Sequence, residues 1–270
     1  MANTSAPHTN SNDAEILFNV QDGIGHVVLN RPQARNALTF EMYDRIAEIC
    51  DGAGSNPELS AIVFSGAGGK AFAAGTDISR FRDFTTPEHA LNYEKRMDSV
   101  LGTIESCKVP TIAAISGACT GGGAAIAACC DIRIATENLK FGFPIARTLG
   151  NCLSAANLSR LVALIGAGRT KDLIFTARLV GAEEAMAAGL LSEILPDFEA
   201  VVARADELAK QMTSHAPLTL QATKEALRRL RQHAAKVEDD DLITLCYMSE
   251  DFREGLEAFL AKRKPDWKGV

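Results

Sequence analysis

The amino-acid sequence predicts an α/β protein that ends in a helical region. Short apolar runs typical of strands alternate with helical patterns up to about residue 195, and almost wholly helical patterns follow. The chain has 270 residues, of which 47% are hydrophobic and 23% are charged, as in an ordinary globular protein. We therefore expect a disordered leader at residues 1–13, an α/β core at 14–195 and a C-terminal helical region at 196–270.

The first half of the chain predicts a hairpin, a capped helix and a buried strand. Residues 15–20 and 24–29 are two β-rich runs, and Gln21-Asp22-Gly23 between them predicts a hairpin turn. Thr39 can cap a helix that runs to about residue 50. The apolar face of that helix is formed by Met42, Tyr43, Ile46, Ile49 and Cys50. A buried strand is expected at residues 61–65 and a helix at about 87–107.

The second half predicts shorter elements and then long helices. We expect a strand at residues 131–135, an irregular segment at 141–157 and a strand at 191–195. Short helices are expected at residues 158–165, 171–176 and 182–188. From residue 197 to 264 the pattern is helical, with breaks at Pro217, near Val237 and at Asp251.

Charge and cysteine content exclude several classes of function. The net charge of −6 and the lack of a basic stripe before the C-terminus argue against a nucleic-acid partner. The seven cysteines include no CxxC pair, which indicates reduced thiols in a cytoplasmic protein rather than disulfides or a zinc site. The first dozen residues are polar and lack the features of a signal peptide. We therefore expect no metal and no membrane partner.

Residues 109–130 form an uncharged stretch around which the chain is organised. Pro110 and the glycines that follow argue against a transmembrane helix. Residues 111–115 predict a buried strand, and a helix is expected from about Ala124, after Gly121-Gly122-Gly123. A helix that begins at such a turn leaves free backbone N–H groups, where a negative oxygen can bind. A second interpretation is that the glycines only allow the helix and strand to pack closely.

Four segments, taken in order, resemble the crotonase family, which is the enoyl-CoA hydratase/isomerase superfamily. The segments are residues 29–38 (LNRPQARNAL), 70–78 (KAFAAGTDI), 110–123 and 258–265 (AFLAKRKP). The resemblance covers about residues 15–267. It implies a spiral β core of stacked turns wrapped by helices, and a C-terminal helical region that forms a homotrimer or a dimer of trimers. It also implies an acyl-CoA thioester as ligand, with no cofactor beyond the coenzyme A of the substrate.

The family motifs also assign roles to individual residues. Thr76 and Gly122 match the two residues whose backbone N–H groups form an oxyanion hole for the thioester oxygen. The residues that match substrate and coenzyme A contacts are Arg35, Ala37, Ala73, Asp77, Ile78, Gly121, Ile145, Phe259 and Lys262. In the family the C-terminal contacts can come from a neighbouring subunit. Two of these residues have a second interpretation: Asp77 can cap a helix that starts near Ile78, and Lys262 can complement the dipole at a helix C-terminus.

The sequence departs from the hydratase pattern at both catalytic glutamate positions. Ala125 stands where GGGxE has its glutamate, and Ile145 stands where FGxPE has its glutamate. The loop that follows is polar, and its Arg147 can hold a carboxylate of the substrate or form a structural ion pair. Cys152 can act as a nucleophile, although buried thiols are usually inert.

These features predict an acyl-CoA enzyme that works through a thioester enolate. The family label is enoyl-CoA hydratase/isomerase, although a chain without both glutamates is expected to add water poorly. Decarboxylation and thioester hydrolysis are alternatives, and decarboxylation forms the enolate without a base. A further alternative is a protein that only binds acyl-CoA, but simple binding needs no preorganised oxyanion hole.

Overall fold

The computed structural model of the protein describes residues 14–233 and 238–270. The predicted leader and the predicted break near Val237 lie outside the described residues. The strands are β1 (Ile16–Gln21), β2 (Ile24–Leu29), β3 (Ala61–Gly66), β4 (Ala71–Ala74), β5 (Thr111–Ile115), β6 (Ala118–Thr120), β7 (Ile132–Thr136), β8 (Lys140–Gly142) and β9 (Glu193–Leu195). The α-helices are α1 (Phe40–Gly52), α2 (Pro87–Glu105), α3 (Gly122–Cys129), α4 (Ile145–Thr148), α5 (Ala155–Phe175), α6 (Ala182–Ala187), α7 (Phe198–Thr213), α8 (Pro217–His233), α9 (Asp240–Tyr247) and α10 (Glu250–Leu260).

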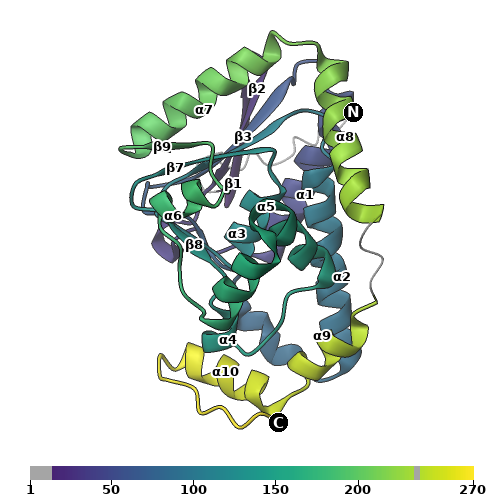
Figure 1. Ribbon diagram of the computed structural model, residues 1–270, viewed down its shortest axis with the longest axis vertical. Helices are drawn as coiled ribbons and strands as arrows, with labels where there is room; N and C mark the ends of the chain where they lie inside the picture. The colour runs from purple at the N-terminus through teal and green to yellow at the C-terminus, as the bar shows by residue number, and fades with distance from the viewer. Residues whose placement is uncertain (1–13, 234–237) are drawn as a thin grey trace, which may run out of the picture.

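The strands form two sheets (Figure 1). The larger sheet has the strand order β1-β2-β3-β5-β7-β9, and the smaller sheet has the order β4-β6-β8. The β1–β2 hairpin is antiparallel, and the remaining pairs of these strands are parallel. Parallel neighbours require long crossover connections, which the chain supplies as helices and as strands of the other sheet.

Successive turns of the chain build both sheets together. β3 and β4 belong to one turn, β5 and β6 to the next, and β7 and β8 to the third. Each turn therefore adds one strand to each sheet, and the turns stack as a spiral. This is the core that the resemblance implies. Because β4, β6 and β8 run parallel, the loops that leave their carboxyl ends emerge at the same edge of the smaller sheet.

Helices cover both faces of the larger sheet (Figure 1). α7 packs against β3, β5 and β7 through the buried residues Val201, Ala205 and Ala209. α1, α2 and α3 contribute to the main apolar core. α9 and α10 lie at the opposite end of the molecule from α7, where α10 packs on α4 and on the 3-10 helix η3 (Ile78–Asp83). None of the helices in residues 14–233 and 238–270 has both the length and the apolar character needed to cross a bilayer.

Local sequence signals account for the hairpin and for α1. Asp22 and Gly23 both have positive φ angles, of 52° and 83°, as a tight two-residue hairpin turn requires. The Thr39 hydroxyl accepts a hydrogen bond from the Met42 amide, which caps α1 as predicted. The buried residues of α1 are those that the periodicity predicts.

Several boundaries differ from the prediction. The two helices expected at residues 158–165 and 171–176 belong to one element, α5, which is kinked at Gly166, where φ is 78°. The segment expected to be irregular contains most of β8 and all of α4. The helix expected from about Ala124 is α3, which already starts at Gly122. β4 and β8 have only four and three residues, which is too short for periodicity to identify.

Candidate active site

Strand register brings two glycine turns together at the edge of the smaller sheet. Ala74 at the end of β4 pairs with Thr120 at the end of β6. Each strand is followed by a glycine with a positive φ angle, which is 115° at Gly75 and 52° at Gly121. A Cβ placed on Gly121 would lie 3.4 Å from the Cα of Gly75, so the two turns are in contact. Thr76 and Gly122 follow at equivalent positions of the two turns.

The backbone amides of Thr76 and Gly122 have no backbone acceptor in the part of the chain that the structure describes. Leu38 forms a parallel bridge to Thr76, in which the Leu38 amide donates to the Gly75 carbonyl and the Leu38 carbonyl accepts from the Asp77 amide. Both hydrogen bonds use the neighbours of Thr76, so the Thr76 amide itself points away from Leu38. Gly122 is the first residue of α3, where an N–H group has no partner within the helix. Two amide donors are thus available side by side.

Tyr43 and Thr76 fill the space beside the Cα of Gly122. The Tyr43 hydroxyl lies 2.9 Å from the Thr76 Oγ1. A Cβ on Gly122 would overlap the Tyr43 hydroxyl and would lie 2.7 Å from the Thr76 Oγ1. Position 122 therefore requires glycine. Burial raises the pKa of Tyr43 well above its usual range, so its hydroxyl keeps its proton.

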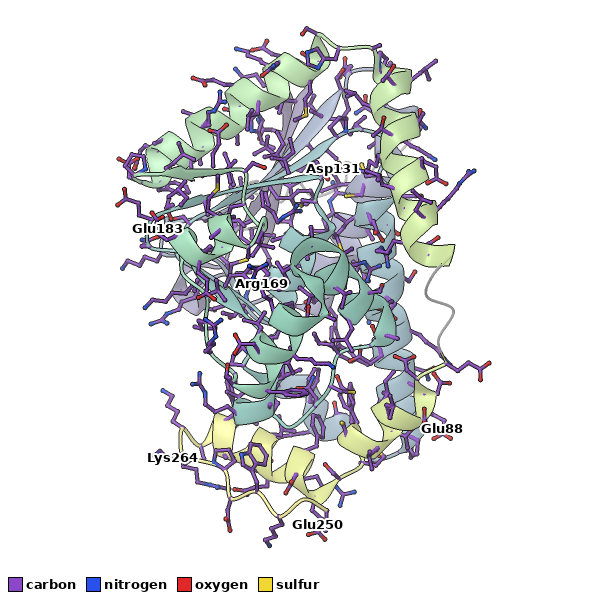
Figure 2. All side chains as sticks on the ribbon, in the orientation of Figure 1. Glu88, Asp131, Arg169, Glu183, Glu250 and Lys264 are labelled. Carbon is purple, nitrogen blue, oxygen red and sulfur yellow. The ribbon has the colours of Figure 1, made fainter. Side chains whose placement is uncertain are left out.

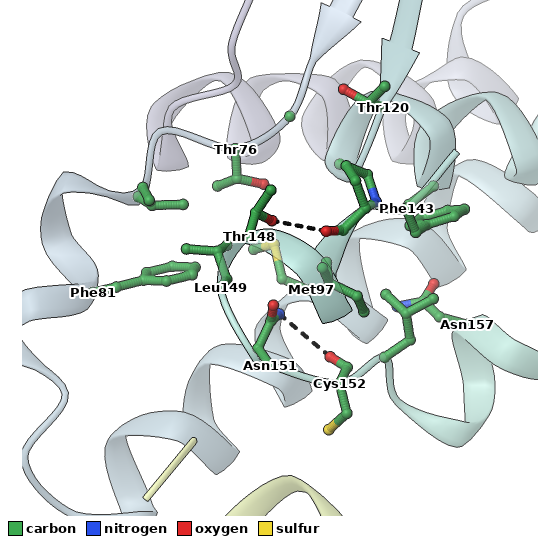
Figure 3. Close-up of a pocket in the computed structure, with 18 of the residues that line it drawn as sticks. Thr76, Phe81, Met97, Thr120, Phe143, Thr148, Leu149, Asn151, Cys152 and Asn157 are labelled. Atoms are coloured by element: carbon green, nitrogen blue, oxygen red, sulfur yellow. Dashed lines mark hydrogen bonds between the residues drawn. The ribbon is translucent and has the colours of Figure 1, made fainter. Parts of the chain in front are cut away.

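A cavity of about 150 Å³ opens at these two turns (Figure 3). Its walls come from η3, α2, α3, α4 and the loop that precedes α5. The apolar part of the wall includes Ile78, Phe81, Met97, Phe143, Ile145 and Leu149. In Figure 3, Thr76 lies on the opposite side of the cavity from Asn151 and Cys152. Ala125 and Ile145, the two positions that the hydratase pattern reserves for glutamate, both line the cavity.

A buried carboxyl group also lines the cavity. Glu94 of α2 is only 6% exposed, and it accepts a hydrogen bond from the Tyr247 hydroxyl of α9 through Oε1. The Asn151 amide in turn donates to the Tyr247 hydroxyl at 3.2 Å. Burial raises the pKa of Glu94 to about 7. Sequence reasoning missed this residue.

The signal for Glu94 was present in the helical periodicity. The buried face of α2 is formed by Ala90, Glu94, Met97, Val100, Leu101 and Ile104. A glutamate at an apolar position of such a stripe predicts a buried carboxyl, and buried carboxyls need a partner or a function.

Other predicted site residues lie around the cavity or at the surface. Ile78 and Phe259 line the cavity, although Phe259 of α10 is still 52% exposed. Ala73 is fully buried in β4. The Asp77 carboxylate accepts a hydrogen bond from the Ser79 amide and caps η3, and it also pairs with Arg31 at 3.4 Å. The helix-capping interpretation of Asp77 is therefore confirmed.

Three predicted cations are exposed. Arg35 and Lys262 both adopt left-handed backbone conformations on the surface, with φ angles of 50° and 54°. The Arg35 carbonyl accepts a hydrogen bond from the Ala74 amide, which ties the predicted coenzyme A segment, including the half-buried Ala37, to β4. Arg147 lies on the exposed side of α4 and is not among the residues that line the cavity. Figure 2 shows Lys264 at the surface beside α10.

Cys152 lines the cavity but does not have the features of a nucleophile. A hydrogen bond with Cys246 and burial both raise the pKa of its thiol. Its Sγ lies 3.7 Å from the Leu242 carbonyl oxygen, to which the thiol donates. A protonated, hydrogen-bonded thiol is a poor nucleophile. In the described residues, no group of three or more His, Cys, Asp or Glu side chains is arranged to hold a metal ion.

Comparison with known proteins identifies relatives over nearly the whole chain. The family model described as enoyl-CoA hydratase/isomerase matches residues 19–270. The chain is 32% identical to 2,3-dehydroadipyl-CoA hydratase of Escherichia coli over 95% of its own length and 99% of the relative's length. It is 33% identical to short-chain-enoyl-CoA hydratase of Clostridium acetobutylicum, with coverages of 92% and 95%.

A solved structure also matches the chain over nearly its whole length. A methylmalonyl-CoA decarboxylase in complex with 2-nitronate-propionyl-CoA superposes with a TM-score of 0.86 at 25% identity, and the match covers 95% of this chain and 99% of that chain. Together the comparisons confirm the resemblance predicted from the four sequence segments and the spiral fold that it implies.

Proposed function

Because the chain belongs to the enoyl-CoA hydratase/isomerase family, the crotonase family, we propose that this acyl-CoA enzyme acts through a thioester enolate whose oxygen binds the Thr76 and Gly122 amides. The observation that carries this proposal is the register of β4 and β6, which places two free amides next to each other at the cavity. A thioester carbonyl gains negative charge as the enolate forms. Each preorganised donor in a site that excludes water lowers the barrier by about 2.7–4 kcal/mol.

The coenzyme A portion of the substrate is proposed to lie along the exposed cations. Arg35 and Ala37 form one contact region for the adenine and its phosphate, and Lys262 forms another. The protein as a whole is acidic, so exposed cations at these positions favour the binding of an anionic ligand there. Phe259 joins the Lys262 region to the cavity, since its ring belongs to the cavity wall. Ile78 and Gly121 line the cavity beside the two amides. Ala73 in β4 and Asp77 after Thr76 are proposed to support the first of the two turns.

The reaction is proposed to differ from ordinary hydration. Ala125 and Ile145 present only apolar groups to the cavity, so neither can transfer a proton. Addition of water to a 2-enoyl-CoA requires one group to activate the water and one to deliver a proton, and each is worth about 10²–10⁴-fold. The similarity to proteins named hydratases supports the substrate class, which is enoyl-CoA or a related acyl-CoA thioester.

Decarboxylation is a second candidate. It is supported by the similarity to methylmalonyl-CoA decarboxylase and by the apolar walls of the cavity. Loss of CO₂ produces the same enolate without a base, and an apolar site favours the loss of a charged carboxylate. Arg147 is exposed and is not among the residues that line the cavity, so the cavity geometry does not add support to its predicted contact with a substrate carboxylate.

We also propose that the protein assembles as a homotrimer or a dimer of trimers in the cytoplasm. Exposed large apolar side chains on α8 are Leu218, Leu227 and Leu230, and those on α9 are Leu242 and Leu245. Apolar side chains gathered in this way favour burial against another protein surface. The seven cysteines are all free, as expected for a reducing compartment.

Assays with three classes of thioester test the function. Purified protein is incubated with crotonyl-CoA, a malonyl-type CoA ester and a saturated acyl-CoA, while binding of each ester is measured by calorimetry. Turnover of at least one ester supports the proposed function. Binding without turnover of any ester contradicts it and favours a protein that only binds acyl-CoA. Crotonyl-CoA hydration at about 1–10³ s⁻¹ contradicts the proposal that the reaction differs from ordinary hydration: either the alignment of Ala125 and Ile145 with the two glutamates is wrong, or another base serves.

A matched pair of variants tests the amide donor of Gly122. Both carry Tyr43→Phe, which removes the hydroxyl that a Cβ at position 122 would overlap. Gly122→Ala keeps the backbone N–H, whereas Gly122→Pro deletes it, and proline is well accepted at the first position of a helix. We expect the proline variant to be slower than the alanine variant by about 10²–10³-fold in kcat. Equal rates in two folded variants contradict the oxyanion role.

A further inference from the structure

We propose that Glu94 is the acid/base residue of this enzyme and that it exchanges a proton with the acyl chain of the bound thioester. The proposal rests on the proposed function, since the enolate must first be stabilised at Thr76 and Gly122. It extends that function by naming a proton-transfer group where Ala125 and Ile145 offer none.

The position of Glu94 connects the two ends of the cavity. Its neighbour in space, Tyr43, reaches the Thr76 hydroxyl at 2.9 Å, and the Glu94 charge contributes to the raised pKa of Tyr43. The Glu94 charge also contributes to the raised pKa of Cys152 on the opposite wall. Glu94 thus lines the same cavity as Thr76 and Gly122 and also as Asn151 and Cys152 of the polar loop, so an acyl chain bound in this cavity would share it with the carboxyl.

The hydrogen bonds of Glu94 leave one oxygen for the substrate. Oε1 accepts from the Tyr247 hydroxyl, which is itself held by the Asn151 amide at 3.2 Å. Among the described residues, no donor binds Oε2. Tyr247 and Asn151 thus orient the carboxyl while Oε2 remains available to the cavity. The Asn151 Oδ1 is buried without a partner, so the cavity wall retains an additional acceptor that a bound ligand can satisfy.

The surroundings of Glu94 favour its neutral form up to about neutral pH. The charges of Asp98 of α2 and Asp239 before α9 both raise the pKa of Glu94 in addition to the effect of burial. The remaining titratable groups that face it are Tyr43 of α1, Tyr93 of α2, Tyr247 of α9 and Cys152. With a pKa of about 7, the carboxyl can either take or give a proton under ordinary conditions.

The proposed step is a proton shuttle. The Glu94 carboxylate takes a proton from the carbon next to the thioester carbonyl, so that a C–H bond breaks and an O–H bond forms. The electron pair of the C–H bond enters the enolate, whose oxygen is bound by the two amides. Glu94 then returns the proton to the same carbon or to the far carbon of a conjugated chain. One carboxyl is sufficient for such a double-bond migration, whereas water addition needs a second group.

An alternative role for Glu94 is purely structural, in which the carboxyl only holds Tyr247 and with it α9 against α2. A leucine or methionine would pack at this position of the stripe without the cost of burying an acid. The experiment must therefore separate proton transfer from the anchoring of α9.

Glu94→Gln is the decisive variant, because it keeps the size of the side chain and an acceptor for the Tyr247 hydroxyl. Its activity is followed by conversion of 3-butenoyl-CoA to crotonyl-CoA and by exchange of the α-protons of a saturated acyl-CoA in D₂O. We expect both rates to fall by about 10²–10⁴-fold while the binding of the ester is unchanged. Glu88→Gln, at an exposed site on the first turn of the same helix, is the matched control and should keep wild-type rates.

The wild-type pH profile provides a second measurement that does not depend on folding of a variant. We expect kcat to fall about tenfold per pH unit below a midpoint near 7. Tyr247→Phe removes a hydrogen bond that lowers the pKa of Glu94, so the midpoint should move to higher pH. A merely structural carboxyl would leave the profile unchanged.

The outcomes of these experiments are distinct. A wild-type enzyme that turns over or exchanges an ester, together with a folded Glu94→Gln variant of equal rate, overturns only the role of Glu94. A flat wild-type profile between pH values of about 5 and 8 overturns it as well. Wild-type protein that acts on no ester overturns the proposed function and this proposal with it.

Discussion

The hydroxyl groups of Tyr43 and Thr76 lie 2.9 Å apart and close the space beside the Cα of Gly122. Tyr43 comes from the buried face of α1, and Thr76 comes from the turn after β4. The two side chains therefore fix the position of one proposed amide donor from outside its own turn. The identity of residue 122 is set by this contact and not by the conformation of α3 alone.

Gly122→Ala should inactivate the enzyme while Tyr43→Phe restores part of the activity. The added methyl group overlaps the Tyr43 hydroxyl and must displace the turn or the ring. We expect kcat to fall by roughly 10²-fold, as misplacement by about 1 Å does elsewhere, and to recover partly in the double variant. Gly52→Ala at the exposed end of α1, where the added Cβ meets nothing within 4 Å, is the control. Equal activity of the single and double variants would contradict the steric argument.

Asn36→Ala should destabilise the protein by about 3 kcal/mol. The Asn36 side chain is buried and donates to the carbonyl oxygens of Ala67 and Ala71 at 3.1 and 2.8 Å, and it accepts from the Arg31 amide at 3.0 Å. Removal leaves these backbone groups without their partner next to the start of β4. Urea unfolding measures the change. Asn19→Ala, on the exposed side of β1, should change stability by less than about 0.5 kcal/mol.

Glu94→Gln should stabilise the protein at high pH. The pKa of Glu94 in the folded protein, about 7, lies above the ordinary value of 4.5, so the folded state binds more protons than the unfolded state between these values. The free energy of unfolding of the wild type therefore falls as pH rises through this window. At about pH 8 the variant should be more stable by up to about 3 kcal/mol, and near pH 4.5 the gain should vanish. Urea unfolding at both pH values tests this, and a gain independent of pH would contradict the burial of an ionisable acid.

Lys262→Ala and Arg35→Ala should each weaken the binding of CoA esters. Both side chains are exposed and lie in segments proposed to contact the phosphates of coenzyme A. Because an exposed ion pair is worth up to about 1 kcal/mol, KM should rise roughly five-fold and kcat should stay unchanged. Added salt should reduce the difference between wild type and variants. Lys210→Ala, at an exposed site on α7 outside the segments proposed to contact coenzyme A, should leave KM unaltered, and a similar rise there would argue against specific contacts.

Replacing Leu227 and Leu230 with glutamate should dissociate the proposed oligomer. These side chains on α8 are 63% and 70% exposed in the single chain. Light scattering coupled to size-exclusion chromatography is expected to give a trimer or a hexamer for the wild type and a smaller species for the double variant. Lys210→Glu is the control: it introduces a glutamate on α7, away from the apolar side chains of α8, and should keep the oligomer mass of the wild type. A monomeric wild type would contradict the assembly.

Residues with a local signal were predictable from the sequence. Thr39 was identified as the cap of α1, and Tyr43 was placed on the buried face of that helix. The interpretation of Asp77 as a cap also needed only its neighbours in sequence. Such features depend on hydrogen bonds and periodicity within a few residues, so a single sequence contains the information.

Features that depend on distant contacts were not predictable in the same way. The overlap between Gly122 and Tyr43 joins positions that are far apart in the chain, and no local pattern encodes it. The cavity wall likewise depends on how α4 turns, which leaves Ile145 inside and Arg147 exposed two residues later. Glu94 is predictable only in part. The periodicity of α2 places it on the buried face of that helix, but its partner Tyr247 comes from a helix much later in the chain.

The two proposed donors belong to the main chain, and this has a consequence for how the protein can diverge. Substitution of the side chains that surround the thioester would alter the chemistry performed on the enolate without altering the groups that bind its oxygen. A length change behaves differently: one residue inserted into β4 would slide Thr76 by about 3.3 Å relative to Gly122. New reactions in this fold should therefore arise by substitution of residues in the cavity wall. Insertions and deletions in β4 and β6 should be removed by selection, because they separate the two amide donors.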